Sequence, residues 1–179
     1  MEFVTFNVII DDLVFPDGQT QMGVLGGGGP QAAFGMRLWS DEVGLSARVG
    51  DDLPAGVPAW LDACGIDRGG LRFNELPTPR AWQALEADGR RTQVWRVPGP
   101  VIGAQLARRV VDLPPDYRRA IGYHVGVHPL DFDTGFIADL RLMSQAVMIE
   151  PFKPAERRPA KDELCRLVCA GSIFSPNRE

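Results

Sequence analysis

The sequence is poor in the residues that bind metals and form disulfides. Its 179 residues include two histidines and three cysteines. Three cysteines cannot pair completely, so no disulfide framework is indicated and a reducing compartment, the cytoplasm, is expected. His124 and His128 lie in a segment that we interpret as the end of a strand, with no third ligand nearby. We therefore expect no metal site at these histidines.

Long apolar runs and an excess of basic residues are also missing. No run approaches the roughly 18 apolar residues that a membrane span needs, and the first residues lack the basic region of a signal peptide. The net charge of −4 argues against nucleic acid or an anionic membrane as a partner. Apolar residues make up 45% of the chain, enough for the core of one globular domain spanning residues 1–179.

Short apolar runs rich in β-branched residues alternate with segments of helical periodicity. We expect strands over residues 3–10, 43–49, 120–127, 146–150 and 171–174, and helices over 31–39, 57–64, 105–111, 132–143 and 160–169. This rhythm predicts an α/β fold, a mostly parallel sheet with helices on both faces. Two segments fall outside it: a short strand near 19–25, and a hairpin over 81–97 that turns at Asp88-Gly89. They are expected to form a small antiparallel sheet.

Two kinds of polar segment could bind a ligand. The glycine run Gly26–Pro30 stands between a predicted strand and helix, where free backbone N–H groups suit an anion or a polyhydroxylated ligand, although such a run is also typical of a plain turn. It fits neither the dinucleotide-binding nor the P-loop spacing. Asp11 and Asp12 follow the first predicted strand, and Asp51 and Asp52 follow a later one. Carboxylates there can accept sugar hydroxyls or can be ordinary loop acids, and the residues alone leave both readings open.

Taken in order, these motifs resemble those of the PfkB (ribokinase-like) carbohydrate kinases. The chain reads strand, aspartate, glycine loop, helix, then Val49-Gly50-Asp51-Asp52, Gly65-Ile66-Asp67, the hairpin, and Ser175-Pro176-Asn177. The resemblance covers nearly the whole chain but only the substrate-binding N-terminal half of the family. The segments Gly26–Trp39 and Pro77–Gln83 are most similar to a divergent fungal branch that includes the maintenance-of-killer proteins.

The resemblance implies a role for individual residues. Asp11 corresponds to the aspartate that holds sugar hydroxyls, and Gly27 and Gly28 correspond to the glycines that let the backbone approach the sugar. The segments near 19–25 and 81–97 correspond to a β-lid over the sugar. Asn177 corresponds to an asparagine associated with magnesium and phosphate. A sugar or sugar-like molecule is the implied partner, and ATP and Mg²⁺ are the cofactors expected for the family.

Two departures from the family pattern limit what this chain is expected to do. Gln31 and Ala32 stand where the family has an asparagine, and no Gly-Ala-Gly-Asp segment, the family's anion hole and catalytic base, occurs in the sequence. The resemblance thus implies a kinase-like chain without the C-terminal half of the fold, with no catalytic residue and inactive alone. The alternative is a non-catalytic module that binds a small molecule or a protein. A homodimer through the lid or the unfinished sheet edge is a further expectation.

Overall fold

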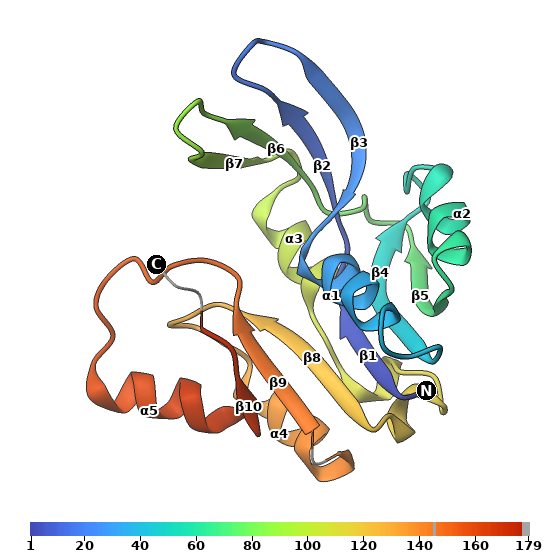
Figure 1. Cartoon of the computed structure of the whole chain (residues 1–179), viewed down its shortest axis with the longest axis vertical. Helices are drawn as coiled ribbons and strands as arrows, with labels where there is room; N and C mark the ends of the chain where they lie inside the picture. Colours follow the sequence, from blue (N-terminus) through green and yellow to red (C-terminus); the bar gives the residue numbers. More distant parts are fainter. Residues whose placement is uncertain (145, 177–179) are drawn as a thin grey trace.

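The computed structural model describes residues 1–144 and 146–176 and contains two sheets (Figure 1). The larger sheet is six-stranded with every pairing parallel, in the order β10-β9-β8-β1-β4-β5. Its strands are β1 (Phe3–Phe6), β4 (Val43–Gly50), β5 (Ile66–Asn74), β8 (Gly122–Val127), β9 (Ala146–Pro151) and β10 (Ile173–Phe174). The predicted mostly parallel α/β architecture is confirmed.

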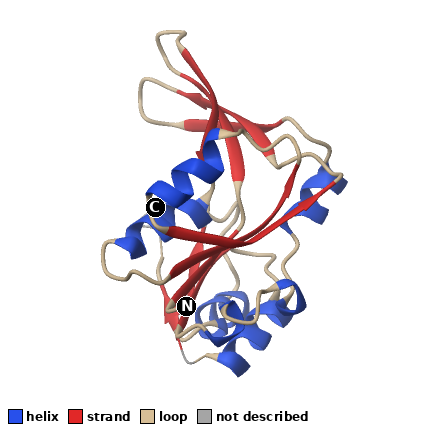
Figure 2. Ribbon diagram, turned by 90° about the vertical axis from the view of Figure 1, so that its right-hand side faces the viewer, coloured by secondary structure: helices blue, strands red, loops and turns tan. Residues whose placement is uncertain are grey.

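The second sheet, which we call the small sheet, stands apart from the larger one (Figure 2). It has four strands in the order β3-β2-β6-β7, which are β2 (Ile9–Val14), β3 (Thr20–Gly26), β6 (Arg80–Leu85) and β7 (Arg91–Trp95). The β2–β3 and β6–β7 pairings are antiparallel, while β2 and β6 run parallel. The segment near 19–25 and the hairpin over 81–97 therefore lie in this sheet, as predicted. The sheet also contains β2, whose first residues fall within the predicted strand 3–10.

That extra strand corrects the interpretation of the N-terminus. The predicted strand 3–10 is two strands, separated at Asn7, whose φ of 71° is the only left-handed value among described residues other than glycine. Asparagine tolerates this conformation better than most residues because its short polar side chain can bond locally. Asp11 and Asp12 consequently lie inside β2 and do not follow a strand of the main sheet.

The larger sheet buries a separate apolar core on each face. Alternate residues of β4, including Val43, Leu45 and Val49, pack under α1 (Gly28–Arg37) and α2 (Gly56–Ala63). On the opposite face, residues of β1, β8 and β9 pack against α4 (Thr134–Met143) and α5 (Lys161–Ala170). Helices therefore cover both faces, which is what a parallel sheet requires.

A crossing segment joins the small sheet to β8. It contains α3 (Gly99–Leu106) and two short 3-10 helices, Val110–Asp112 and Tyr117–Arg119. The helix predicted over 105–111 is wrong in position, because Pro98 and Pro100 start a helix earlier and the chain is already extended at Ala107. Across the described ranges, no helix has both the length and the apolar character needed to cross a bilayer.

Candidate functional site

Asp11 is a partly exposed carboxylate on β2 with one oxygen held and the other free. The side-chain amide of Gln83, on β6, donates to Asp11 Oδ1 at 2.7 Å and to Gln93 Oε1 at 3.2 Å. No described residue donates a hydrogen bond to Asp11 Oδ2. Burial raises the pKa of Asp11, although the Gln83 hydrogen bond and the charge of Arg91 oppose the rise. Asp11 thus presents a fixed acceptor that a ligand hydroxyl could use.

Gly26 makes room for this carboxylate. A Cβ atom at position 26 would lie 1.9 Å from Asp11 Oδ2. Gly27 has a φ of 88°, and a Cβ there would come within 3.2 Å of the Ile9 backbone nitrogen, whereas a Cβ on Gly28 would meet nothing within 4 Å. Of the predicted glycines, Gly27 therefore approaches β2 and Gly28 faces open space. Sequence reasoning missed Gly26, because four consecutive glycines do not reveal which one faces the aspartate.

Asp12 lies on the opposite face of β2 and is fully buried. Arg80 donates to both of its oxygens at 2.8 Å, Gly23 N donates at 2.9 Å, and Arg96 forms a further ion pair. The Arg80 hydrogen bonds, together with those from Gly23 and Arg96, hold the pKa of Asp12 far below its usual range. Asp12 is thus a structural anchor of the small sheet, and the two adjacent aspartates have different roles.

Asp52 is also structural. Its Oδ1 accepts a hydrogen bond from the backbone N–H of Thr78 at 2.8 Å, and the Thr78 hydroxyl accepts one from Gly50 N at 2.9 Å. These bonds tie the segment that precedes β6 to the end of β4. The loop-acid interpretation therefore holds for Asp52.

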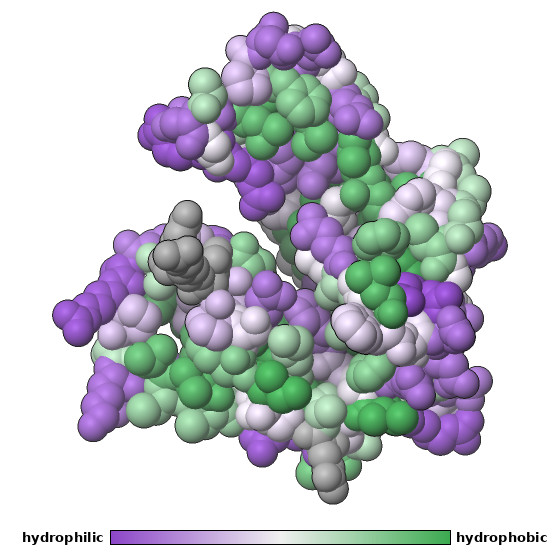
Figure 3. All heavy atoms as spheres, viewed as in Figure 1, coloured by the Kyte–Doolittle hydropathy of each residue, from purple (hydrophilic) through white to green (hydrophobic). Residues whose placement is uncertain are grey.

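A cavity of about 370 Å³ lies beyond the carboxyl ends of β8 and β9. Arg108, His128, Asp131, Asp133 and Phe152 are among its lining residues, with His128 just after β8 and Phe152 just after β9. Figure 3 shows an open notch between the small sheet and the body that carries β8 and β9. Ligands of parallel sheets bind at this edge, so the cavity is a candidate site on topology alone.

The carboxyl end of β1 and the glycine run lie on this same side of the larger sheet, where its strands end. The Asn7 side chain donates to Leu106 O at 3.4 Å, and the Thr5 hydroxyl donates to Gly29 O at 2.9 Å. Leu106 lines the cavity. The turn at Asn7, which leads into the small sheet, therefore also contacts the wall of the cavity.

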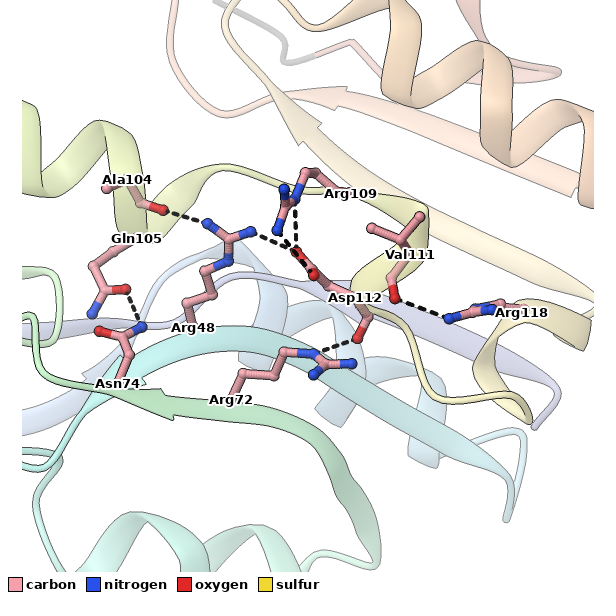
Figure 4. Close-up of polar contacts among 9 residues, drawn as sticks. All are labelled: Arg48, Arg72, Asn74, Ala104, Gln105, Arg109, Val111, Asp112 and Arg118. Carbon is pink, nitrogen blue, oxygen red and sulfur yellow. Dashed lines mark hydrogen bonds and ion pairs between the residues drawn. The ribbon is translucent and has the colours of Figure 1, made fainter.

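Behind the cavity, a cluster of arginines fastens the crossing segment to the larger sheet (Figure 4). Arg48 on β4 donates to Ala104 O at 3.0 Å and pairs with Asp112, which Arg109 also contacts at 3.1 and 3.2 Å. Arg72 on β5 bonds the backbone oxygen of Asp112. Although burial opposes it, Arg48 and Arg109 hold the pKa of Asp112 below its usual value.

The remaining predicted residues are distributed as follows. Asn177 lies outside the described residues. His124 contacts Glu150 through Nε2 at 2.7 Å, in the larger sheet, while His128 lines the cavity. Arg108, between α3 and the first 3-10 helix, was not predicted as a site residue, since nothing in the sequence distinguishes it from the adjacent Arg109. Across residues 1–144 and 146–176, no group of three or more His, Cys, Asp or Glu side chains could hold a metal ion.

Comparison with known proteins finds similarity in structure but not in sequence. No protein-family model matches the sequence, and no curated protein matches it. The fructokinase of Xylella fastidiosa matches 97% of this chain with a TM-score of 0.73 and 18% identity, and its structure with bound ATP gives the same TM-score at 17% identity. A PfkB protein from Polaromonas sp. JS666 matches 97% of the chain, with a TM-score of 0.70 and 18% identity. The nucleoside kinase of Methanocaldococcus jannaschii, an archaeal member of the ribokinase family, matches 99%, with a TM-score of 0.66 and 17% identity.

These matches show a ribokinase-like fold. The chain spans only part of those proteins: 58% of the length of the fructokinase, 65% of the Polaromonas protein and 60% of the nucleoside kinase. A substantial part of each kinase has no counterpart in the 179 residues. At this level of identity the similarity concerns the fold, and the function has to be argued from the site.

Proposed function

We propose that this chain is the sugar-binding part of a carbohydrate-kinase-like protein. The proposal rests on the Asp11 carboxylate, which is half-buried and whose Oδ1 is held by Gln83. Its Oδ2 accepts no hydrogen bond from the described residues and lies beside Gly26, which has no side chain. A fixed anionic acceptor is suited to sugar hydroxyls, because hydrogen bonds to an ionised group are stronger than neutral ones. The small sheet would act as the lid over the sugar, and Gly27 and Gly28 would line its approach.

The phosphoryl-transfer machinery is not supplied by these residues. In related kinases ATP and Mg²⁺ would carry the reaction, but the described residues offer no cluster of ligands for a metal, and the sequence has no Gly-Ala-Gly-Asp segment. The described residues give no ligand set on which to place these cofactors, and we derive no catalytic step. A magnesium- or phosphate-associated role for Asn177 stays a prediction. We expect the isolated chain to bind a sugar without phosphorylating it.

The second candidate function is a non-catalytic module that binds a small molecule or a protein. It would use the same Asp11 site, without phosphoryl transfer. Assignment to the fungal maintenance-of-killer branch stays a prediction. The cytoplasm remains the proposed location, supported by the free thiols of Cys64, Cys165 and Cys169.

Calorimetry with a panel of neutral sugars and nucleosides tests the proposal. We expect a sugar to bind the natural chain and to bind Asp11→Ala roughly tenfold to hundredfold more weakly, the effect of losing a charged hydrogen bond. Asp17→Asn, in the exposed β2–β3 turn, is the matched control and should leave binding unchanged. Equal affinity of the natural chain and Asp11→Ala would remove Asp11 from the site.

A coupled ADP-release assay with the same sugars tests the expected inactivity. Turnover near 1 s⁻¹, an ordinary kinase rate, would contradict it.

A further inference from the structure

Arg108 is a positively charged residue in the lining of the 370 Å³ cavity. Its guanidinium lies 5.4 Å over the ring of Phe136, and Nη1 donates to Gly126 O at 2.9 Å. No Asp or Glu among the described residues forms an ion pair with it. An arginine has five N–H donors, so most of those on Arg108 have no acceptor among the residues that the structure describes. Burial lowers the pKa of Arg108, although the charge of Asp133 opposes the fall.

Arg108 also stands between two cavities. It lines the 370 Å³ cavity and, on its other side, a small one of about 20 Å³ that Arg48, Arg72 and Arg109 also line. Asp112 is the single acid of that smaller lining, and Arg48 and Arg109 already bond its carboxylate. Arginines therefore outnumber acids in the lining of the smaller cavity.

Two acids line the same cavity as Arg108, and the charge of Asp133 offsets the effect of burial on Arg108 only in part. Asp131 and Asp133 are exposed, and Asp133 Oδ1 already accepts the backbone N–H of Phe136 at 2.9 Å as the cap of α4. They make the outer part of the cavity acidic, so an anionic group would be favoured only on the Arg108 side.

His128 supplies a second donor to the same cavity. Its Nδ1 lies 3.2 Å from the backbone nitrogen of Leu130 and 3.1 Å from that of Asp131 and accepts from both. In the neutral imidazole this assigns the proton to Nε2, because the two ring nitrogens cannot both be acceptors. Nε2–H has no acceptor among the described residues.

We infer that Arg108, assisted by His128, binds an anionic group, a phosphate or a carboxylate, on the molecule that enters the 370 Å³ cavity. The planar guanidinium matches the paired oxygens of both groups, and a neutral ligand would leave its charge unpaired at a cost. This inference rests on the proposed function, because it requires that the molecule held by Asp11 also reaches this cavity, and it narrows that function: the substrate class is phosphorylated sugars or sugar acids rather than neutral sugars.

The test compares matched ligands on the folded full chain. Fructose, fructose 6-phosphate, gluconate, ATP and inorganic phosphate are titrated by calorimetry into the natural chain, Arg108→Gln and Arg108→Lys. Arg119→Gln is the control, because it removes an equal charge from an exposed arginine that pairs with Asp116 alone. We expect Arg108→Gln to weaken binding of the anionic sugar tenfold to a hundredfold, Arg108→Lys to weaken it less, and Arg119→Gln to leave it unchanged.

Each outcome decides a separate point. Binding of fructose 6-phosphate but not gluconate assigns a phosphate, and the reverse assigns a carboxylate. ATP as the only ligand that depends on Arg108 would place a nucleotide phosphate there and overturn the sugar class. Neutral sugar binding that depends on Asp11, without any anion binding, would overturn the role of Arg108 and leave the proposed function intact. Binding of inorganic phosphate that depends on Arg108, without any sugar binding, would overturn the proposed function and leave the anion-binding role of Arg108 intact.

Folding is checked separately, because Arg108 also contacts Gly126 and Phe136. Circular dichroism and thermal unfolding of Arg108→Gln and Arg108→Lys establish that each variant is native. If Arg108→Gln does not fold, the Arg108→Lys variant tests the inference, because lysine keeps the charge but lacks the planar guanidinium. An affinity of Arg108→Lys for the anionic sugar equal to that of the natural chain would overturn the inference.

Discussion

The carboxylate of Asp11 occupies the space that a side chain at position 26 would need, with a hypothetical Cβ on Gly26 only 1.9 Å from Asp11 Oδ2. β2 and β3 are paired here, with Ile9 opposite Gly26. The glycine is therefore required by its neighbour's side chain rather than by the bend of its own backbone. Gly26, at the end of β3, and Asp11, on β2, therefore form one structural unit.

Replacing Gly26 by alanine should disturb this unit. The added methyl group has to displace the Asp11 carboxylate or push β3 away, an overpacking change that typically costs about 1–3 kcal/mol. We expect thermal unfolding at a lower temperature and weaker ligand binding. Gly28→Ala is the control, because a Cβ there meets nothing within 4 Å, and it should be neutral or slightly stabilising. Equal effects of the two substitutions would show that Gly26 has no special relation to Asp11.

Asp12→Asn should destabilise the fold strongly at neutral pH. It removes the charge that Arg80 and Arg96 share, and breaking a buried ion pair costs about 3–5 kcal/mol. The lower end of this range is expected, because Arg80 is 29% exposed and water can partly solvate it. Urea unfolding at pH 7 measures the change, with Asp17→Asn expected within about 0.5 kcal/mol of the natural chain.

The same pair predicts how stability depends on pH. The pKa of Asp12 is lower in the folded chain than in the unfolded chain, where an aspartate titrates near about 3.9. Its stabilisation is therefore complete above the unfolded pKa and is lost as the pH falls toward the folded one. Urea unfolding at pH 7, 4 and 3 should show the natural chain losing more stability than Asp12→Asn. Parallel loss in both proteins would contradict this role.

Asp11→Asn should separate binding from stability. Because burial raises the pKa of Asp11, the ionised form is disfavoured in the folded chain, and this group contributes less stability as the pH rises through its folded pKa. A neutral asparagine should therefore leave unfolding at pH 7 unchanged or make the fold more stable, by up to about 1 kcal/mol, while weakening sugar binding. Marked destabilisation would assign Asp11 a structural role like that of Asp12.

Ile173 tests the edge of the larger sheet. β10 is the last strand on one side, pairs only with β9 among the described strands, and carries Ile173 with 49% of its surface exposed. Exposed apolar edges favour pairing with another chain. We expect sedimentation to show a dimer or larger species for the natural chain, and Ile173→Lys to shift it toward monomer. A natural chain that sediments as a monomer would argue against association through this edge.

The sequence predicted the larger elements well because their patterns are local. Residues 43–49 carry an apolar side chain at every second position and residues 146–149 form an apolar run, both typical of strands. Asp88-Gly89 marks its hairpin directly, with Gly89 at a φ of 86°. The break at Asn7 was not predictable, because the residues on both sides of Asn7 are apolar and together look like one strand. That single residue moves the strand carrying Asp11 into the other sheet.

The site was predicted less completely because it depends on contacts between distant residues. The resemblance proposed Asp11 as a sugar-binding residue, but its neighbours Gln83 and Gly26 follow from the register of β2 with β3 and β6. Arg108 acquires its environment only when the crossing segment is laid against β8 and α4. No local pattern distinguishes it from the adjacent Arg109.

Asp11 and Asp12 are adjacent on one strand. Whether an insertion or deletion before them is odd or even in length therefore decides which face of the sheet each side chain occupies. Successive residues of a strand point to opposite faces. Inserting or deleting one residue between Asn7 and Asp11 would place an acid that now faces Gln83 on the side of Arg80, and the acid that now faces Arg80 on the side of Gln83. A change of two residues would keep each acid on its own face. Only even changes of length in this short segment can preserve both the anchor and the acceptor.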